Sequence, residues 1–196
     1  MQVLLIRHPK PDIASGICYG SSDIPAQAEA LSAAFAWLDS YLPEDAEIIA
    51  SPLLRCAQLA AQLRLSGRRT LKLDARLAER CCGAWELKSW DCRPRAEIDA
   101  WATNFMDYAA PDAESVRQLQ TRILAAWESY QAQTESQTRV LLTHAGPIQV
   151  LLAHLTRSNL DAKPIIEVPC GAAVLLLKLT MRPTRGLTGS IASLRH

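Results

Sequence analysis

The sequence predicts an α/β fold, a three-layer α/β/α sandwich around a mostly parallel sheet of about six strands. Short apolar runs rich in branched side chains alternate along the chain with segments whose apolar residues recur at helical spacing. Alternation of this kind is typical of strand–helix–strand units, which favour parallel strands. The length of 196 residues and a hydrophobic content of 49% suit one domain with a full core.

Each element has its own local signal. Strands are predicted where apolar runs are bounded by turn residues, at 3–6, 46–50, 70–73, 140–143, 165–168 and 172–179. Helices are predicted from apolar residues at helical spacing, at 26–41, 52–64, 94–106, 114–134 and 147–155. Ser51 is the expected N-cap of the helix that follows the second strand, with Pro52 in its first turn.

We expect a single domain over residues 1–181. Within it, residues 74–111 are irregular and rich in tryptophan, which predicts a cap or insertion over the site. Residues 182–196 show no periodicity and are interpreted as a tail that need not be ordered.

Composition excludes several function classes. The formal net charge of +1 gives no footprint for nucleic acid or a membrane surface. The apolar run 3–6 is too short for a signal peptide and has no basic segment before it, so a cytoplasmic location is expected. The six cysteines lack paired C-x-x-C spacing and are interpreted as reduced thiols, with no metal site.

Two strands end in residues that suit chemistry on an anion. The first run stops at Arg7-His8, and a later run stops at His144 with Gly146 shortly after. Ligands of open α/β sheets bind at the carboxyl ends of the strands, and a histidine there can act as a nucleophile beside a guanidinium that holds the anion. Taken alone, Arg7 and His8 could equally form an ordinary surface turn.

Three other positions strengthen this interpretation. Arg55 lies one turn into a helix that directly follows a strand, near the helix N-terminus that favours anions. Glu79 lies on an irregular segment near aromatic residues and is a candidate proton donor. Gly146 would let the backbone approach a ligand closely. The alternatives are a solvated helix arginine and an exposed glutamate.

With these residues the chain resembles the histidine phosphatase superfamily, also called the phosphoglycerate mutase-like family. The resemblance rests on five motifs in the family's order: Leu5-Ile-Arg-His8, Ala50-Ser-Pro-Leu-Leu-Arg55, Leu77-Ala-Glu79, Gly83-Ala-Trp85-Glu86 and Leu142-Thr-His144-Ala-Gly146. It implies a phosphoglycerate mutase-like fold and a phosphatase that needs no metal or other cofactor. His8 would attack the phosphoryl group and form a phosphohistidine. Arg7, Arg55 and His144 would bind the phosphate oxygens, and Glu79 would protonate the leaving oxygen.

The chain also departs from the family pattern. Pro9 stands where the family usually has glycine, Ala14 where asparagine is frequent, and Ser21 where arginine is common. Part of the usual second layer of phosphate contacts is therefore missing, which bears on the affinity for substrate and its choice.

Within the superfamily, Arg7-His8-Pro9-Lys10-Pro11 and Gly16-Ile-Cys-Tyr-Gly20 are similar to the α-ribazole phosphatase branch. This resemblance implies a small phosphorylated metabolite as partner, with α-ribazole 5′-phosphate of cobalamin synthesis as the best single substrate. Tyr19 and Trp85 are candidates for contacting its organic part. For the oligomeric state, a homodimer is the one alternative to a monomer. Two alternatives stay open, a phosphoglycerate mutase-type phosphotransferase and a non-catalytic module that binds a phosphorylated ligand.

Overall fold

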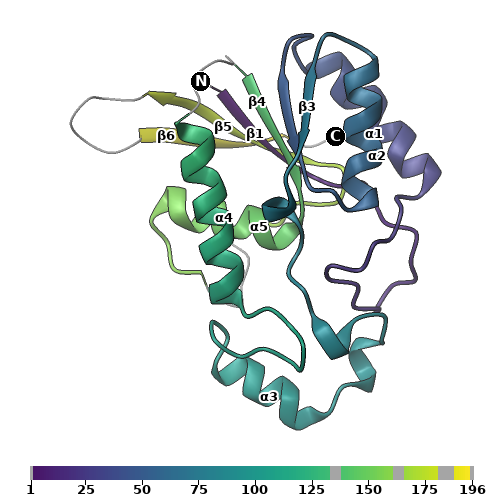
Figure 1. Ribbon diagram of the computed structural model, residues 1–196, viewed down its shortest axis with the longest axis vertical. Coiled ribbons are helices and arrows are strands. Elements are labelled where there is room, and N and C mark those ends of the chain that lie inside the picture. The colour runs from purple at the N-terminus through teal and green to yellow at the C-terminus, as the bar shows by residue number, and fades with distance from the viewer. Residues whose placement is uncertain (1, 133–137, 161–165, 181–187, 195–196) are drawn as a thin grey trace.

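A single mixed sheet forms the centre of the protein. The computed structural model describes residues 2–132, 138–160, 166–180 and 188–194. The sheet order is β3-β2-β4-β1-β5-β6. The strands are β1 (Gln2–Arg7), β2 (Glu47–Ala50), β3 (Thr70–Leu73), β4 (Thr138–Thr143), β5 (Ala173–Thr180) and β6 (Thr188–Leu194). The first four of the sheet order run parallel, and β5 is antiparallel to both its neighbours, so the mostly parallel sheet is confirmed (Figure 1).

Helices cover both faces of this sheet, which makes the three layers. The helices are α1 (Ala28–Tyr41), α2 (Leu54–Leu65), α3 (Arg95–Thr103), α4 (Val116–Gln131) and α5 (Ala145–Thr156). On one face, Leu4 and Ile6 of β1 join a core with α1 and α2. On the other face, Val3 and Leu5 join a core with α4 and α5. Successive strand residues point to opposite faces, so a strand covered on both sides is apolar throughout.

All five helices begin one or two residues from the predicted position, and the starts of α4 and α2 show which contacts set them. Helix α4 begins with a capping box, in which Ser115 Oγ accepts from Gln118 N at 3.2 Å and Gln118 Oε1 accepts from Ser115 N at 2.8 Å. Helix α2 begins at Leu54, and Ser51 is not its N-cap. Instead, Asp23 reaches over from a distant loop and accepts from Leu54 N at 2.7 Å, which leaves Ser51 for another partner.

One further prediction near the C-terminus is wrong. The described part of the expected strand 165–168, residues 166–168, is not a strand, and residue 165 lies outside the described residues. Its carbonyls are occupied by side chains instead: Ile166 O accepts from Gln149 Nε2 and Val168 O from Arg7 Nη1. Within the tail 182–196, for which the sequence shows no periodicity, Thr188–Leu194 form β6, which pairs with the open edge of β5.

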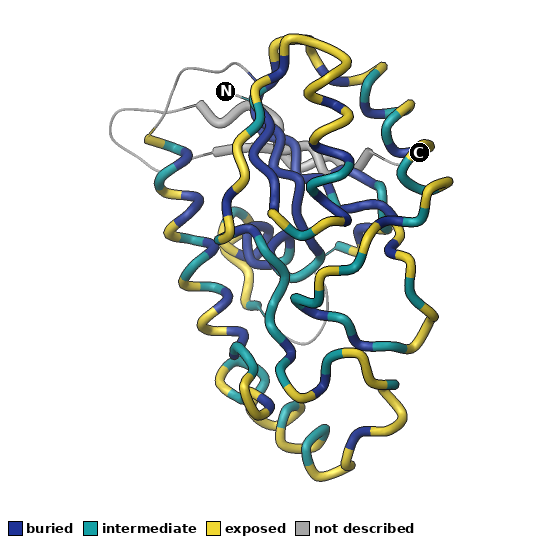
Figure 2. The backbone as a smooth tube through the Cα atoms, turned by 45° about the vertical axis from the view of Figure 1, so that its right-hand side comes forward, coloured by how far each residue is buried: buried dark blue, intermediate teal, exposed yellow. Residues whose placement is uncertain are grey.

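Most of the irregular region forms a separate layer below the sheet in Figure 1. Its first 3-10 helix, η1 (Ala75–Leu77), still packs on the sheet, with Leu77 in the core beside α4. The lower layer contains the 3-10 helices η2 (Gly83–Trp85) and η3 (Trp90–Cys92), and then α3. A small apolar cluster holds it together, with Cys18, Cys82, Trp85 and Ala110 buried at its centre. Figure 2 shows nearly continuous burial in strands β1, β2 and β4 and mostly half-buried or exposed backbone in this region. We call residues 80–113 together with the loop 10–25 the cap.

Candidate active site

His8 lies at the carboxyl end of the central strand β1, next to the end of β4. Its backbone N–H donates to Thr143 O at 3.0 Å, and the side chain is only 1% exposed. Its Nδ1 lies 2.7 Å from Pro9 O. Because a carbonyl can only accept, Nδ1 must carry the proton, and Nε2 keeps its lone pair. Pro9, the residue that departs from the family pattern, therefore supplies the group that sets the tautomer.

Burial keeps this imidazole neutral. Removal from water, together with the positive charges of Arg55 and Arg7, lowers the pKa of His8 to about 3. At neutral pH the ring is therefore uncharged, with Nε2 unprotonated and able to attack an electrophile.

His144 faces His8 from the end of β4, with the ring centroids 5.0 Å apart. Its Nε2 lies 2.8 Å from Ser51 Oγ, which itself accepts from Leu53 N. The Ser51 hydroxyl can therefore donate to Nε2, and in that tautomer the proton lies on Nδ1. Burial lowers the pKa of His144 well below its usual value, so this ring is also neutral. Its Nδ1 is buried and has no hydrogen-bond partner among the described residues, so it can donate to an anion.

Two guanidinium groups complete the positive side of the site. Arg55 is fully buried and donates to Ser22 O at 2.8 Å and Gly20 O at 2.7 Å. Arg7 donates to Val168 O at 2.8 Å. Within the described part of the chain, the Nε of neither arginine has a partner. Two fixed cations with donors left over suit an oxyanion.

Glu79 contacts the N-terminus of α5. Its Oε2 accepts from Gly146 N at 3.2 Å and its Oε1 from Arg80 N at 2.9 Å. A Cβ on residue 146 would lie 2.3 Å from Glu79 Oε1. Gly146 thus makes room for the carboxylate of Glu79, whereas the sequence suggested that it makes room for a ligand.

Two charged residues that sequence reasoning did not select hold these groups in place. Arg122 of α4 donates to the carbonyls of Arg76, Ala78 and Glu79 and pairs with Glu114 at 2.6 Å. It fixes the segment that carries Glu79. An arginine on an amphipathic helix is usually solvated, so its spacing gave no signal.

Glu86 holds the loop that carries the carbonyls bound by Arg55. It accepts from Ser21 N and Cys82 N, each at 2.8 Å, and from the hydroxyls of Ser21 and Ser22. Burial alone would raise the pKa of Glu86, but the hydrogen bonds from Ser22, Cys82 and Ser21 outweigh it and lower that pKa. Ser21, where the family usually has arginine, therefore helps Glu86 to hold this loop in place.

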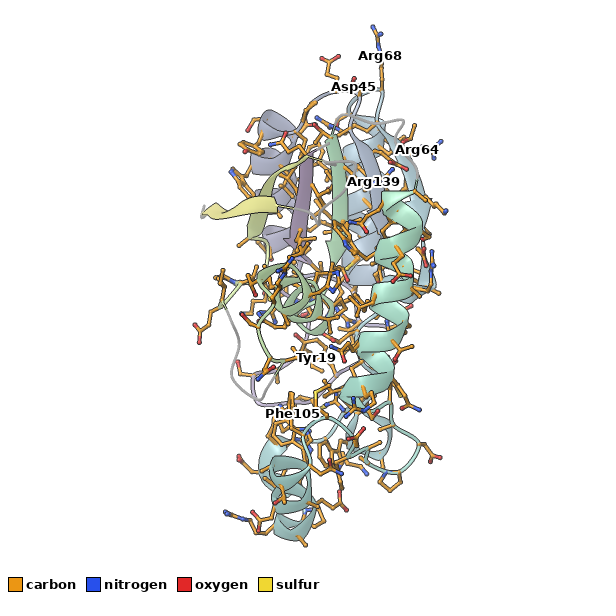
Figure 3. The ribbon with its side chains drawn as sticks, turned by 90° about the vertical axis from the view of Figure 1, so that its left-hand side faces the viewer. Tyr19, Asp45, Arg64, Arg68, Phe105 and Arg139 are labelled. Atoms are coloured by element: carbon orange, nitrogen blue, oxygen red, sulfur yellow. The ribbon has the colours of Figure 1, made fainter. Side chains whose placement is uncertain are left out.

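A cavity of about 290 Å³ opens beside Glu79, between the loop 10–25 and the segment 80–113 of the cap. Tyr19 lines it, 5.2 Å from Arg55 Cζ measured to the ring centroid. Figure 3 shows Tyr19 between the sheet and the part of the cap that carries Phe105. Trp85 does not line the cavity: it is 4% exposed and donates from Nε1 to Glu97. The exposed tryptophan at the cavity is Trp90, which sequence reasoning did not select.

The described residues also bear on metal binding, disulfide bonds and membrane insertion. Among the described residues, no group of three or more histidine, cysteine or acidic side chains is placed to hold a metal ion. The six cysteines are free thiols. No helix in the described ranges combines the length and the apolar character needed to cross a bilayer.

Known proteins share this sequence pattern and this fold. The family model of the histidine phosphatase superfamily (branch 1) matches residues 3–184. No curated protein matches the sequence.

Solved structures match over almost the whole chain. Protein TTHB049 of Thermus thermophilus is 25% identical, with a TM-score of 0.71 and 99% of each chain covered. A phosphoglycerate mutase of the same organism is 25% identical, with a TM-score of 0.71, covering 100% of this chain and 99% of its own. A candidate alpha-ribazole-5'-P phosphatase of Escherichia coli K-12 reaches a TM-score of 0.84 at 17% identity, covering 100% of this chain and 97% of its own. At 17% identity that last likeness shows the fold alone.

Proposed function

Since this chain belongs to the histidine phosphatase superfamily, we propose that it is a phosphomonoesterase that needs no metal and works through a phosphohistidine on His8. The observation that carries the proposal is the state of His8. It is a buried, neutral imidazole whose Nδ1 proton is held by Pro9 O, so that Nε2 is available beside two guanidinium groups. Phosphoglycerate mutases share this family, and a phosphotransferase is the second candidate.

The phosphate would be held by the groups that have donors left over. The Nε atoms of Arg7 and Arg55 and Nδ1 of His144 are these donors. Their fixed positions would stabilise the charge on the phosphoryl oxygens as it spreads in the transition state. His8 Nε2 then forms a bond to phosphorus as the bond from phosphorus to the ester oxygen breaks.

Glu79 is the proposed proton donor to the departing ester oxygen. In the second half, water attacks the phosphohistidine, Glu79 takes a proton from that water, and the P–N bond breaks to release inorganic phosphate. Its place is supported by the contacts of its carboxylate with Gly146 N and Arg80 N at the wall of the cavity.

For the substrate, we propose α-ribazole 5′-phosphate and hence a role in cobalamin synthesis in the cytoplasm. The motifs around Arg7 and Tyr19 support this choice, and the Escherichia coli protein has the same fold. A non-catalytic role is disfavoured because Arg7, His8, Arg55, Glu79 and His144 are all present, and the rings of His8 and His144 lie 5.0 Å apart.

The test is phosphate release from α-ribazole 5′-phosphate in the presence of EDTA, by the wild type and by His8→Ala. Release that EDTA does not affect and that the variant loses is expected, together with an acid-labile phosphoenzyme in the wild type. Loss of release with EDTA would contradict the metal-free mechanism. Release from other phosphomonoesters but not from this one would reject the substrate only. Phosphate transfer between two phosphoglycerates faster than release to water would favour the mutase.

A further inference from the structure

Trp90 is the large aromatic residue of the cap that combines exposure with a place at the cavity. Its side chain belongs to η3 and is 43% exposed, and it lines the cavity together with Tyr19 and Glu79. Single exposed apolar residues are common, so the exposure of Trp90 has meaning only because the residue lines a cavity. Trp85, whose ring centroid lies 6.4 Å from that of Trp90, is buried.

Arg93 holds the Trp90 ring from behind. Its guanidinium carbon lies 3.3 Å from the Trp90 ring centroid and 4.7 Å from that of Trp85. Arg93 is 9% exposed, and all three of its guanidinium nitrogens are buried without a hydrogen-bond partner in the described ranges. The two indole faces are therefore its main source of stabilisation. Since Arg93 covers one face of Trp90, a ligand can use only the remaining face or edge.

The cavity in front of Trp90 connects to the proposed chemistry through its other walls. Glu79 is one wall, Tyr19 lies against Arg55, and the carbonyl of Gly20 accepts from Arg55 Nη2. Ile17 and Cys18 make the floor apolar. Because Glu79 lines this cavity, a phosphomonoester whose leaving oxygen is near Glu79 can place its organic part there. The volume of about 290 Å³ suits a group of one or two rings.

We propose that Trp90, positioned by Arg93, is a specificity-determining residue that stacks on a planar aromatic or heteroaromatic ring in the organic part of the substrate. This inference rests on the proposed phosphatase function and adds the residues that select the substrate class. Because Arg93 already fixes the orientation of the Trp90 ring, this ring loses little conformational freedom when a ligand binds. Trp90 and Arg93 together therefore form a preorganised stacking surface. Arg93 acts through Trp90 and is a positioning residue.

The experiment compares two phosphomonoesters that differ in the ring, 1-naphthyl phosphate and glycerol 3-phosphate. With Trp90→Ala we expect KM for the naphthyl ester to rise about 5- to 100-fold, the range found for loss of one aromatic stacking partner. kcat for that ester and both constants for glycerol 3-phosphate should stay within about threefold, as the groups that hold the phosphate are untouched. Trp90→Phe should restore most of the affinity.

Two further variants separate positioning from stability. Arg93→Met keeps the length of the side chain and removes its charge, so it should raise KM for the naphthyl ester alone, and Arg93→Lys should partly rescue it. Tyr41→Ala, an aromatic of similar exposure on α1, is the matched control and should change neither substrate.

The outcomes distinguish this inference from the proposed function. Equal changes for both esters, or none for the naphthyl ester, would overturn the ring subsite while the phosphatase stands. If the wild type hydrolyses neither ester, calorimetric binding of 1-naphthyl phosphate to His8→Ala decides the subsite, and release of phosphate from α-ribazole 5′-phosphate decides the phosphatase proposal separately. Binding weakened by adding Trp90→Ala would support it, and unchanged or undetectable binding would reject it.

Discussion

At the scale of single residues, burial determines both the protonation state of His8 and its effect on the free energy of unfolding. The folded protein keeps this ring neutral with a pKa of about 3, whereas the unfolded chain binds a proton at about 6.5. Between these two values the unfolded state holds more protons, so the free energy of unfolding rises with pH. The contribution is complete above about pH 6.5 and is lost as pH falls towards 3.

We therefore expect the wild type to lose about 2 kcal/mol of stability through His8 between pH 7 and pH 5, from the linkage of its proton. His144, whose pKa is also lowered by burial, adds a loss of the same sign. His8→Asn removes the contribution of His8, and urea unfolding at pH 7 and at pH 5 measures the loss of stability in the wild type and in the variant. Equal pH dependence in wild type and variant would show that His8 titrates normally in the folded state.

The proposed proton transfer from Glu79 gives a second prediction at this scale. Glu79→Gln should lower kcat/KM for an alkyl phosphate about 10²- to 10³-fold, because an alkoxide leaves poorly without a proton. For p-nitrophenyl phosphate, whose leaving group needs no proton, the loss should stay below about tenfold. Steady-state kinetics on the two esters check this. Equal losses would assign Glu79 a role in binding and not in proton transfer.

At the scale of elements, the contact between Glu79 and the start of α5 depends on Gly146. A Cβ there would meet Oε1 at the far end of a flexible side chain, so the carboxylate can move away at small cost. Gly146→Ala should thus change the free energy of unfolding by less than about 1 kcal/mol, since alanine also favours the helix. kcat/KM for an alkyl phosphate should fall at least about tenfold, because the proton donor is displaced.

Thermal unfolding and kinetics on the same preparations test this. Gly67→Ala is the control, because its Cβ would find no atom closer than 3.4 Å, and it should leave the kinetics unchanged. A Gly146→Ala protein with full activity would show that the position of Glu79 beside α5 is not needed.

The elements also show how far sequence reasoning reached. Strands β1, β2 and β4 are continuous apolar runs covered on both faces, and such runs are readable without a structure. His8, Arg55 and His144 follow from where those strands end. The strand expected at 165–168 failed because its carbonyls bind Gln149 and Arg7, a long-range choice that the apolar pattern does not encode. In the same way, nothing in the spacing of Trp85 and Trp90 tells which one the cap buries.

At the scale of the whole molecule, Arg122 joins α4 to the segment that leads into the cap. Its guanidinium binds three carbonyls and Glu114, and the two paired side chains are only 24% and 17% exposed. Arg122→Met would leave these acceptors and the Glu114 carboxylate without their donor. We expect a loss of about 2–4 kcal/mol. Activity should fall as well, because Glu79 O is one of the three carbonyls.

The matched control lies on the same helix. Arg117 pairs with Asp107, but the two side chains are 58% and 49% exposed. Water screens such a pair, so Arg117→Met should cost at most about 1 kcal/mol and leave kcat unchanged. Chemical denaturation and kinetics of the two variants measure the contrast. Equal losses would mean that Arg122 contributes no more than a surface charge.

The position of β1 between β4 and β5 has a consequence for how the protein is made on the ribosome. Strand β1 is translated before the other strands of the sheet, yet its pairing with β4 joins Gln2 to Thr138, far later in the chain. Until β4 has been translated, the residues of β1 have neither sheet partner, and their apolar surface is open to chaperones and to aggregation. Nascent chains halted before residue 138 should therefore bind chaperones through this segment and show no catalysis. The candidate site therefore forms late in synthesis, when β1 pairs with β4 and β5.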